Sequence, residues 1–183
     1  MTPTSNGRAH CSPKRIIIAA AAVLLICFSH ASAQEGDLTP PRVEVKATFG
    51  AAGFGDEIEY PHVVAGGSVR FYLTRRLSVE PELLYMRRSA ADQDYLFVPS
   101  VAYDLVDPRE RAVPYVIGGV GVYQRRGQFT SPATWSADVG AGVKIFLNDR
   151  LFIAPEARLG YVGYEATMRG TVGVGYVLSG RRR

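Results

Sequence analysis

The stretch WSADVGAGVKIFL, residues 135–147, alternates between two kinds of side chain. Its even positions are polar or small from Ser136 to Lys144, while its odd positions are apolar throughout: Trp135, Ala137, Val139, Ala141, Val143, Ile145 and Leu147. A two-residue period is typical of a β-strand whose two faces meet different surroundings. Residues 63–73 and 77–85 repeat the pattern, and no helical periodicity follows the N-terminal segment. The chain is therefore predicted to be all-β.

Turn signals divide the chain into eight candidate strands: 42–53, 62–73, 77–88, 94–105, 113–124, 134–147, 151–165 and 168–178. Most are long enough to cross a bilayer when tilted, for which about 9 to 11 residues are needed. Tight polar turns are predicted at 74–76 and 148–150, with a longer one at 106–112. Mostly longer loops alternate with them, although the last link, at Ala166-Thr167, is short. This organisation favours an antiparallel up-and-down barrel in a membrane.

An internal similarity supports the repeated hairpins. A shift of 74 residues aligns 66–82 with 140–156 without a gap, matching these seven pairs: Gly66 with Gly140, Val69 with Val143, Leu73 with Leu147, Arg76 with Arg150, Leu77 with Leu151, Pro81 with Pro155 and Glu82 with Glu156. Proline cannot donate to a β-ladder, so Pro81 and Pro155 predict bulges or strand ends.

The period alone does not say which face is outside, because a lipocalin-like soluble carrier also has eight strands but keeps its apolar face inside. The apolar faces are nearly free of charge, whereas charges of both signs occupy the opposite faces: Glu44, Lys46, Arg70, Glu80, Glu82, Asp138, Lys144, Glu156, Arg158 and Arg169. Aromatic residues often lie near strand ends, as an interfacial girdle requires: Tyr85, Tyr95, Tyr103, Tyr115, Tyr123, Trp135, Tyr161 and Tyr176. Both features favour the membrane arrangement.

The N-terminus has the pattern of a secretory signal peptide. Basic residues precede the uncharged apolar run 16–28, which Ala31-Ser32-Ala33 follows. Cleavage after Ala33 leaves 183 − 33 = 150 residues, removes both cysteines and lowers the net charge from +4 to (21 − 3) − 17 = +1. Basicity therefore does not indicate nucleic-acid binding. Ile26 stands before Cys27, where a lipoprotein signal needs a small residue, so lipidation is not expected.

The last strand is similar to the C-terminal β-signal of bacterial outer-membrane proteins through Thr171, Gly173, Tyr176 and Leu178. It departs from that signal in ending on Leu178, followed by the basic tail 179–183, rather than on a terminal aromatic. With the glycine-rich stretches 114–121 and 140–144, residues 42–178 resemble the small outer-membrane β-barrel domain family, including the OmpA-like transmembrane domain. The resemblance implies an eight-stranded transmembrane barrel in the Gram-negative cell envelope and leaves its activity open.

The sequence predicts no catalytic or metal-binding pattern. His62 is the one histidine of the mature chain, and Ser68 lies six residues away, about 20 Å along a strand. The segment Asp92-Gln93-Asp94 provides two carboxylates that calcium could use, but solvated loop residues are the favoured interpretation. The glycines at 118–121 and 173–175 complete no nucleotide-binding motif. We therefore expect no enzyme activity, no catalytic residue, no cofactor and no metal.

The inward charges allow two interpretations, an ion path or a salt-bridged plug that fills a narrow lumen, and the plug is favoured. Arg87-Arg88 and Arg125-Arg126 flank the longer loops, where they are expected to be solvated or to contact lipopolysaccharide phosphates. In the strand at 113–124, two sets compete for the lipid face: Val116, Gly118, Val120 and Val122 against Tyr115, Ile117 and Gly119.

Together these inferences predict a signal peptide at 1–33, a short lead at 34–41, an outer-membrane barrel domain at 42–178 and a tail at 179–183. The expected function is structural or loop-mediated binding in the cell envelope, in a monomer exported through the inner membrane. The expected partners are outer-membrane lipids, with lipopolysaccharide among them, and the outer-membrane assembly machinery, and nucleic acid is not one of them. The alternatives are a narrow pore for small solutes, a lipid-modifying barrel enzyme and a lipocalin-like carrier.

Overall fold

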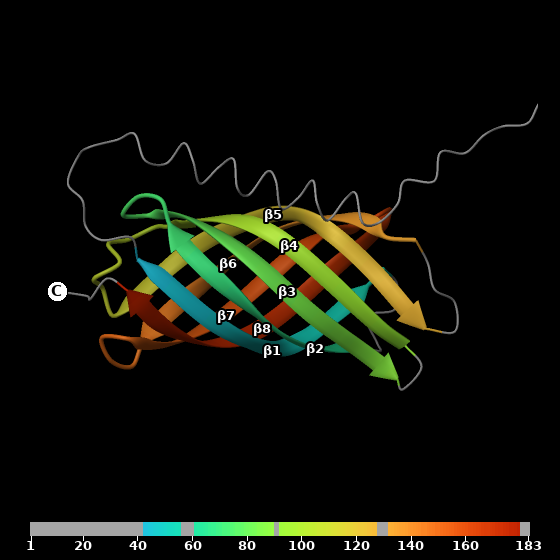
Figure 1. Ribbon diagram of the computed structural model, residues 1–183, viewed down its shortest axis with the longest axis horizontal. Helices are drawn as coiled ribbons and strands as arrows, with labels where there is room; N and C mark the ends of the chain where they lie inside the picture. The colour runs from blue at the N-terminus through green and yellow to red at the C-terminus, as the bar shows by residue number, and fades with distance from the viewer. Residues whose placement is uncertain (1–41, 56–60, 90–91, 128–131, 180–183) are drawn as a thin grey trace, which may run out of the picture. The chain divides into compact units, whose positions relative to one another are not determined.

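A closed antiparallel barrel of eight strands makes up the described part of the chain (Figure 1). The computed structural model describes residues 42–55, 61–89, 92–127 and 132–179. The strands are β1 (Val43–Phe54), β2 (His62–Tyr72), β3 (Leu77–Ser89), β4 (Asp92–Asp104), β5 (Ala112–Gly127), β6 (Thr134–Phe146), β7 (Leu151–Val162) and β8 (Glu165–Ser179). Each strand pairs with the next, and β8 pairs with β1. The predicted fold class is confirmed, while the predicted signal peptide lies outside the described residues.

The barrel has two distinct ends, which we call the turn end and the loop end. The turn end holds the connectors 73–76, 105–111 and 147–150, together with the paired residues Val43 and Ser179 of the first and last strands. The loop end holds the connectors 55–61, 90–91, 128–133 and 163–164. Two of the four loop-end connectors have only two residues, so the contrast in length between the ends is weaker than the sequence predicted.

The two hairpins that resemble each other in sequence have the same local structure. In the turn between β2 and β3, the Thr74 hydroxyl accepts hydrogen bonds from the backbone N–H groups of Arg76 and Leu77. In the turn between β6 and β7, the Asn148 side-chain oxygen accepts the equivalent bonds from Arg150 and Leu151. A short polar side chain that satisfies the backbone of its own turn explains why Thr and Asn occupy this place.

The prolines interrupt the ladder without shifting its register, which corrects the prediction of bulges or strand ends. Between β2 and β3 the pairs Ser68–Glu82 and Phe71–Val79 keep one register, and the two pairs between them, beside Pro81, are missing. Pro155 has the same effect between β6 and β7. A proline lacks the N–H group that a ladder pair needs, so each one opens the ladder locally inside a continuous strand.

The connection between β7 and β8 lies three residues earlier than predicted. Val162 pairs with Glu165, so the loop consists of Gly163 and Tyr164 rather than Ala166-Thr167. Gly163 has a φ of 60°, a left-handed conformation that two-residue hairpin loops require and that glycine adopts without steric cost. Ala166 and Thr167 instead belong to β8.

Side-chain parity now assigns the faces of β5. Tyr115 and Ile117 are buried inside the barrel at 1% and 2% exposure, while Val116 and Val120 point outward at 43% and 68%. Tyr123 is also buried, so Tyr115 and Tyr123 do not belong to the predicted girdle of outward aromatics.

Over the described residues, no helix is long and apolar enough to span a membrane.

Two inward-facing glycines make room for the largest rings of the interior. A Cβ atom on Gly142 would lie 2.6 Å from Cζ of Tyr115, and one on Gly175 would lie 2.1 Å from Cζ of Phe152. Both rings are almost fully buried. Glycine at these positions is therefore a packing requirement of a narrow barrel.

We predict that Gly175→Ala destabilises the folded barrel by about 1–3 kcal/mol, because the added methyl group overpacks the buried Phe152 ring. The measurement is the free energy of unfolding in urea for barrels refolded into lipid vesicles. Gly170→Ala is the matched control, since Gly170 lies on the outward face of the same strand and has nothing within 4 Å of its added Cβ. Equal stability of the two variants would contradict the packing argument.

Candidate functional site in the barrel lumen

The lumen is built around the carboxylate of Glu80, which projects inward from β3. Its Oε1 lies 2.9 Å from Lys46 Nζ on β1 and accepts a hydrogen bond of 2.6 Å from Ser68 Oγ on β2. Its Oε2 lies 2.5 Å from Nη2 of Arg70, also on β2. Glu80 is 1% exposed. A carboxylate removed from water is stable only with such partners, and alternation along three adjacent strands supplies them.

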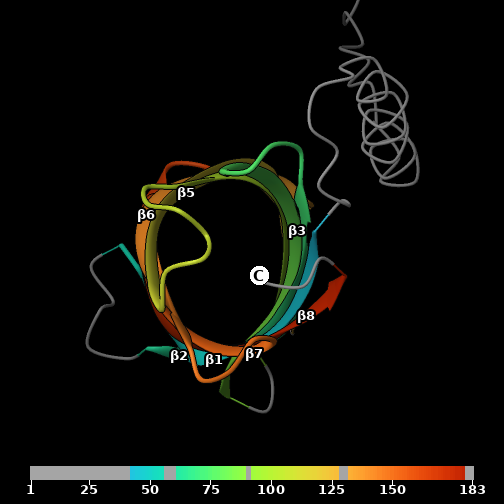
Figure 2. The ribbon, with the colours of Figure 1, turned by 90° about the vertical axis from the view of Figure 1, so that its left-hand side faces the viewer.

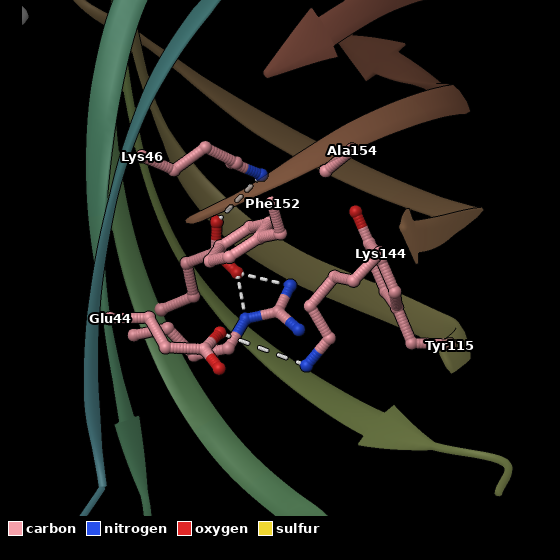
Figure 3. Close-up of a pocket in the computed structure, with 8 residues that line it drawn as sticks. Glu44, Lys46, Tyr115, Lys144, Phe152 and Ala154 are labelled. Carbon is pink, nitrogen blue, oxygen red and sulfur yellow. Dashed lines mark hydrogen bonds and ion pairs between the residues drawn. The ribbon is translucent and has the colours of Figure 1, made fainter. Parts of the chain in front are cut away.

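A second carboxylate, Glu156 on β7, connects Glu80 to the opposite wall of the barrel. It lies 3.3 Å from the same Lys46 Nζ and accepts a 2.6 Å hydrogen bond from the Tyr115 hydroxyl on β5. Arg158 Nε donates to its other oxygen at 2.7 Å. Figure 3 shows Lys46, Tyr115 and Lys144 reaching into this central space from different strands. The cluster therefore crosses the barrel instead of following one wall.

Two arginines extend the network toward the loop end. Arg158 Nη2 lies 3.3 Å from Glu82, and its Nη1 donates to Asp138 at 3.1 Å. Arg169 on β8 approaches the same two carboxylates, at 2.9 Å from Glu82 and 3.4 Å from Asp138. Each guanidinium therefore bridges β3 and β6, which is the kind of multidentate pairing that its planar fork of donors allows.

A third group lies toward the turn end around Lys144. Its ammonium group lies 2.9 Å from Asp104 and 3.7 Å from Glu44, and it donates a hydrogen bond to the Tyr72 hydroxyl. Arg42 Nη2 lies 2.5 Å from the other oxygen of Glu44. Asp104, at the end of β4, was not among the inward charges predicted from the sequence.

The charges of this band are balanced. It contains six carboxylates and six cationic groups: Glu44, Glu80, Glu82, Asp104, Asp138 and Glu156, with Arg42, Lys46, Arg70, Lys144, Arg158 and Arg169. All ten inward charges predicted from the two-residue period are among them. The band is therefore neutral as a whole, as a set of charges excluded from water must be.

Two buried apolar clusters lie in the lumen, one toward each end of the barrel. At the turn end Val113, Phe146, Phe152, Ala154 and Val177 pack together, and Val106 packs against them. Val106 belongs to the 105–111 connector, which Figure 2 shows in yellow, bending over the mouth of the barrel. At the loop end the buried cluster is Ala52, Phe54, Val64, Leu84, Met86, Leu96, Val98 and Tyr123. At the turn end these residues lie level with the charged ones, since Val113 pairs with Lys144 and Val177 with Glu44. Apolar and charged side chains therefore fill the interior together.

Two small cavities lie in the described lumen. One, in the charged band, has about 10 Å³ open to the centre of a water molecule and is lined by Glu44, Lys46, Arg70 and Glu80 among others. The other, toward the loop end, has about 20 Å³ and is lined partly by Arg158 and Arg169. A void of this size holds about one water molecule. Neither cavity has room for an organic ligand.

His62 lies in the lumen near the loop end and not in a catalytic arrangement with Ser68. Its Nε2 is 3.5 Å from Asp94 Oδ2, and its ring meets Phe54 edge-on at 5.0 Å. Ser68 Oγ instead donates to Glu80. Asp94 is fully buried and is also 3.6 Å from Arg125 Nε, so the expectation of a solvated loop carboxylate was wrong for Asp94. Among the residues that the structure describes, no group of acidic, histidine or cysteine side chains could hold a metal.

The four arginines near the loop end separate between the two faces. Arg125 points toward Asp94 in the lumen, and Arg126 is exposed, with its guanidinium carbon 5.4 Å from the Tyr95 ring centroid. Arg87 and Arg88 are both exposed; Arg87 pairs with Gln93 on the outer face, and Arg88 lies where the β3–β4 register is irregular.

We predict that Glu80→Gln destabilises the barrel by about 3–5 kcal/mol, because Lys46 and Arg70 then remain buried beside a neutral amide. The measurement is again unfolding in urea from lipid vesicles. Asp149→Asn, which removes a charge from the exposed turn between β6 and β7, should change stability by less than about 0.5 kcal/mol.

The double variant Glu80→Gln with Lys46→Met checks the cause of that loss. It removes one charge of each sign and keeps the band neutral, so it should lose less stability than Glu80→Gln alone. A larger loss in the double variant would show that charge balance is not what stabilises the lumen.

Comparison with known proteins agrees with this geometry. The family model of the outer membrane protein beta-barrel domain matches residues 19–178. A search of curated proteins finds no match. Among solved structures, the N-terminal beta-barrel domain of Pseudomonas aeruginosa OprF is similar with a TM-score of 0.62 and 18% identity, over 75% of this chain and 97% of that one.

Two further structures have the same fold. Neisserial surface protein A is similar with a TM-score of 0.59 and 15% identity, over 74% of this chain and 96% of that one. The attachment invasion locus protein Ail of Yersinia pestis has a TM-score of 0.52 and 12% identity, over 75% and 97%. These identities show a shared fold, and the family indicates an outer-membrane location. With a family model that spans most of its length and a closed eight-stranded barrel, the chain belongs to the outer membrane protein beta-barrel domain family.

Proposed function

We propose that this protein is a non-conducting, non-catalytic barrel of the outer membrane, with a structural role in the cell envelope or a binding role at its loop end. The observation that carries the proposal is the filled lumen: a neutral band of paired charges packed together with two apolar clusters. Ions crossing this interior would have to break the pairs, and each broken pair leaves a buried charge without its partner.

The arrangement of His62 supports a non-catalytic role. A hydrolase of lipids would need an activated nucleophile beside a general base. The Ser68 hydroxyl instead donates a 2.6 Å hydrogen bond to the Glu80 carboxylate. His62 lies instead between Phe54 and Asp94, inside the apolar cluster of the loop end. Its burial among these groups fits a packed core residue better than a base that must meet substrate.

A narrow pore for small solutes is the second candidate. The observation that favours it is the charged lining of the two small cavities. The closed barrel is the stronger proposal because both of these cavities are of water size, and because buried apolar clusters fill the lumen beside the charged groups toward both ends.

We predict that the wild-type protein gives no steady current in a planar lipid bilayer. The variant Lys46→Ala, Arg70→Ala, Glu80→Ala and Glu156→Ala removes two charges of each sign along with their side-chain volume, so it should conduct. The measurement is single-channel recording at a fixed salt concentration. A different gel mobility before and after boiling verifies that each sample is folded. A large and steady wild-type conductance would replace this proposal with the pore.

We also propose that the chain reaches the outer membrane as an exported precursor and is inserted as a monomer by the outer-membrane assembly machinery. The observations behind this are the signal-peptide pattern and the resemblance of the last strand to a β-signal at Thr171, Gly173, Tyr176 and Leu178.

We predict that the mature protein in the outer-membrane fraction begins at Gln34. N-terminal sequencing together with intact mass measures this, and the mass also reveals any lipid on Cys27. The variant Ala33→Leu should accumulate as the uncleaved precursor, because the cleavage site requires small residues. An unprocessed wild-type chain or a lipidated Cys27 would contradict the assignment.

A further inference from the structure

The outer face of the barrel is apolar except in one place. Among the strand residues whose burial the structure describes, side chains on this face are aliphatic, aromatic, methionine, proline or glycine, apart from four polar residues: Arg87, Gln93, Gln124 and Arg126. All four lie at the loop end of three adjacent strands, β3 to β5. We call them, together with Tyr85 and Tyr95, the β3–β5 rim patch. Polar residues needed only to mark the membrane boundary would be distributed around all eight strands.

Strand register arranges the patch in two rows. Gln93 of β4 pairs with Arg87 on one side and with Arg126 on the other, so these three side chains form the upper row. Tyr95 pairs with Tyr85 and Gln124 in the row below. Rows on one face are two residues apart, or about 7 Å along the strand. The row with the two arginines therefore lies two residues nearer the loop end than the row with the two tyrosines.

The aromatic row fixes the depth of the patch in the membrane. The rings of Tyr85 and Tyr95 lie 5.5 Å apart, and such rings favour the level of the lipid headgroups. Arg126 extends over the Tyr95 ring at 5.4 Å, which restricts its side chain before any ligand binds. The guanidinium groups are thus placed where the phosphates of membrane lipids lie.

We propose that Arg87, Gln93 and Arg126 form a binding site for a phosphate group of the outer-leaflet glycolipid, lipopolysaccharide. The proposal rests on the outer-membrane placement given above, with the turn end and the chain termini facing the periplasm. Strands two apart are about 10 Å from each other, so the two arginine side chains can converge on one anion above Gln93. The fork of donors on each guanidinium matches phosphate oxygens.

The structure also refines which arginines take part. Arg125 is turned toward the lumen and Asp94, and Arg88 lies where the β3–β4 register is irregular. The site therefore uses Arg87 and Arg126, together with two tyrosines and a glutamine that no sequence pattern groups with them.

The test measures how tightly the mature barrel, refolded in detergent, retains diphosphorylated lipid A by native mass spectrometry. The double variant Arg87→Gln and Arg126→Gln should bind lipid A about tenfold more weakly or worse, because the loss of two charge-assisted hydrogen bonds lowers the affinity by at least that factor. Arg75→Gln with Arg76→Gln is the matched control, because it removes the same charge from exposed residues at the turn end, and it should bind like the wild type.

Three further arms separate the sources of binding. Dephosphorylated lipid A and phosphatidylglycerol should bind more weakly than the diphosphorylated form, and millimolar inorganic phosphate should not displace it. The variant Arg87→Lys with Arg126→Lys keeps the charge and loses the forked guanidinium donors, so its affinity for lipid A should lie between those of the wild type and the Gln variant. It replaces the Gln variant if that one fails to fold.

Unchanged binding by the Gln variant, or an equal loss in the turn-end control, would overturn the proposal. So would wild-type binding that does not depend on the lipid phosphates. The conductance experiment is made on the wild type without added glycolipid. If lipid A does not bind, the proposal of a closed lumen is therefore unaffected. If the wild type conducts, the lipid-binding measurement is still valid.

Discussion

The constraint on which the structure depends is the narrowness of an eight-stranded barrel. Closure of the sheet gives every backbone group a partner at membrane depth, and it leaves an interior wide enough only for side chains. The inward residues must then fill that space without water, and inward glycines such as Gly142 and Gly175 make room for the large rings. Because half of the positions in each strand point inward, the chain needs a core that is largely polar and still neutral. The six carboxylates and six cations of the charged band meet that need.

The charged band also ties together strands that share no ladder. Lys46 of β1 meets Glu156 of β7, and Arg169 of β8 meets Glu82 of β3. Nearest-neighbour pairing in the sheet cannot supply such links, because each strand bonds only to the two beside it. A barrel in lipid gains little from burying its apolar outer face against another protein surface, so contacts across the lumen carry much of the tertiary specificity. The three prolines that open the ladder at Pro81, Pro99 and Pro155 are tolerated in this setting, since register is kept on both sides of each one.

Much of this could be predicted from the two-residue period. Parity alone identified ten inward charges, and the repeated hairpin identified two equivalent turns. Parity could not identify partners, since Arg169 and Glu82 are 87 residues apart and meet only once the barrel is closed. It also failed where both faces of a strand are apolar: Tyr115 and Tyr123 of β5 near predicted ends looked like interfacial residues, yet both are buried. Asp94 was misjudged for a related reason, because a carboxylate near a strand end is usually solvated, whereas here the lumen extends to the ends of β4, where Asp104 is buried as well.

The same parity argument favours the strands over the loops as the place of the proposed binding. Two of the four connectors at the loop end are two-residue links, which provide little surface for a partner. β5, with 16 residues the longest strand, and β3 and β4, with 13 each, carry the polar rows of the rim patch above the aromatic level. An outer face that is otherwise free of charge makes such a local exception informative, because an arginine in contact with lipid is costly unless its charge reaches water or an anion. The interior therefore accounts for the stability of this barrel, and its specificity toward the membrane is to be sought at the rim of β3 to β5.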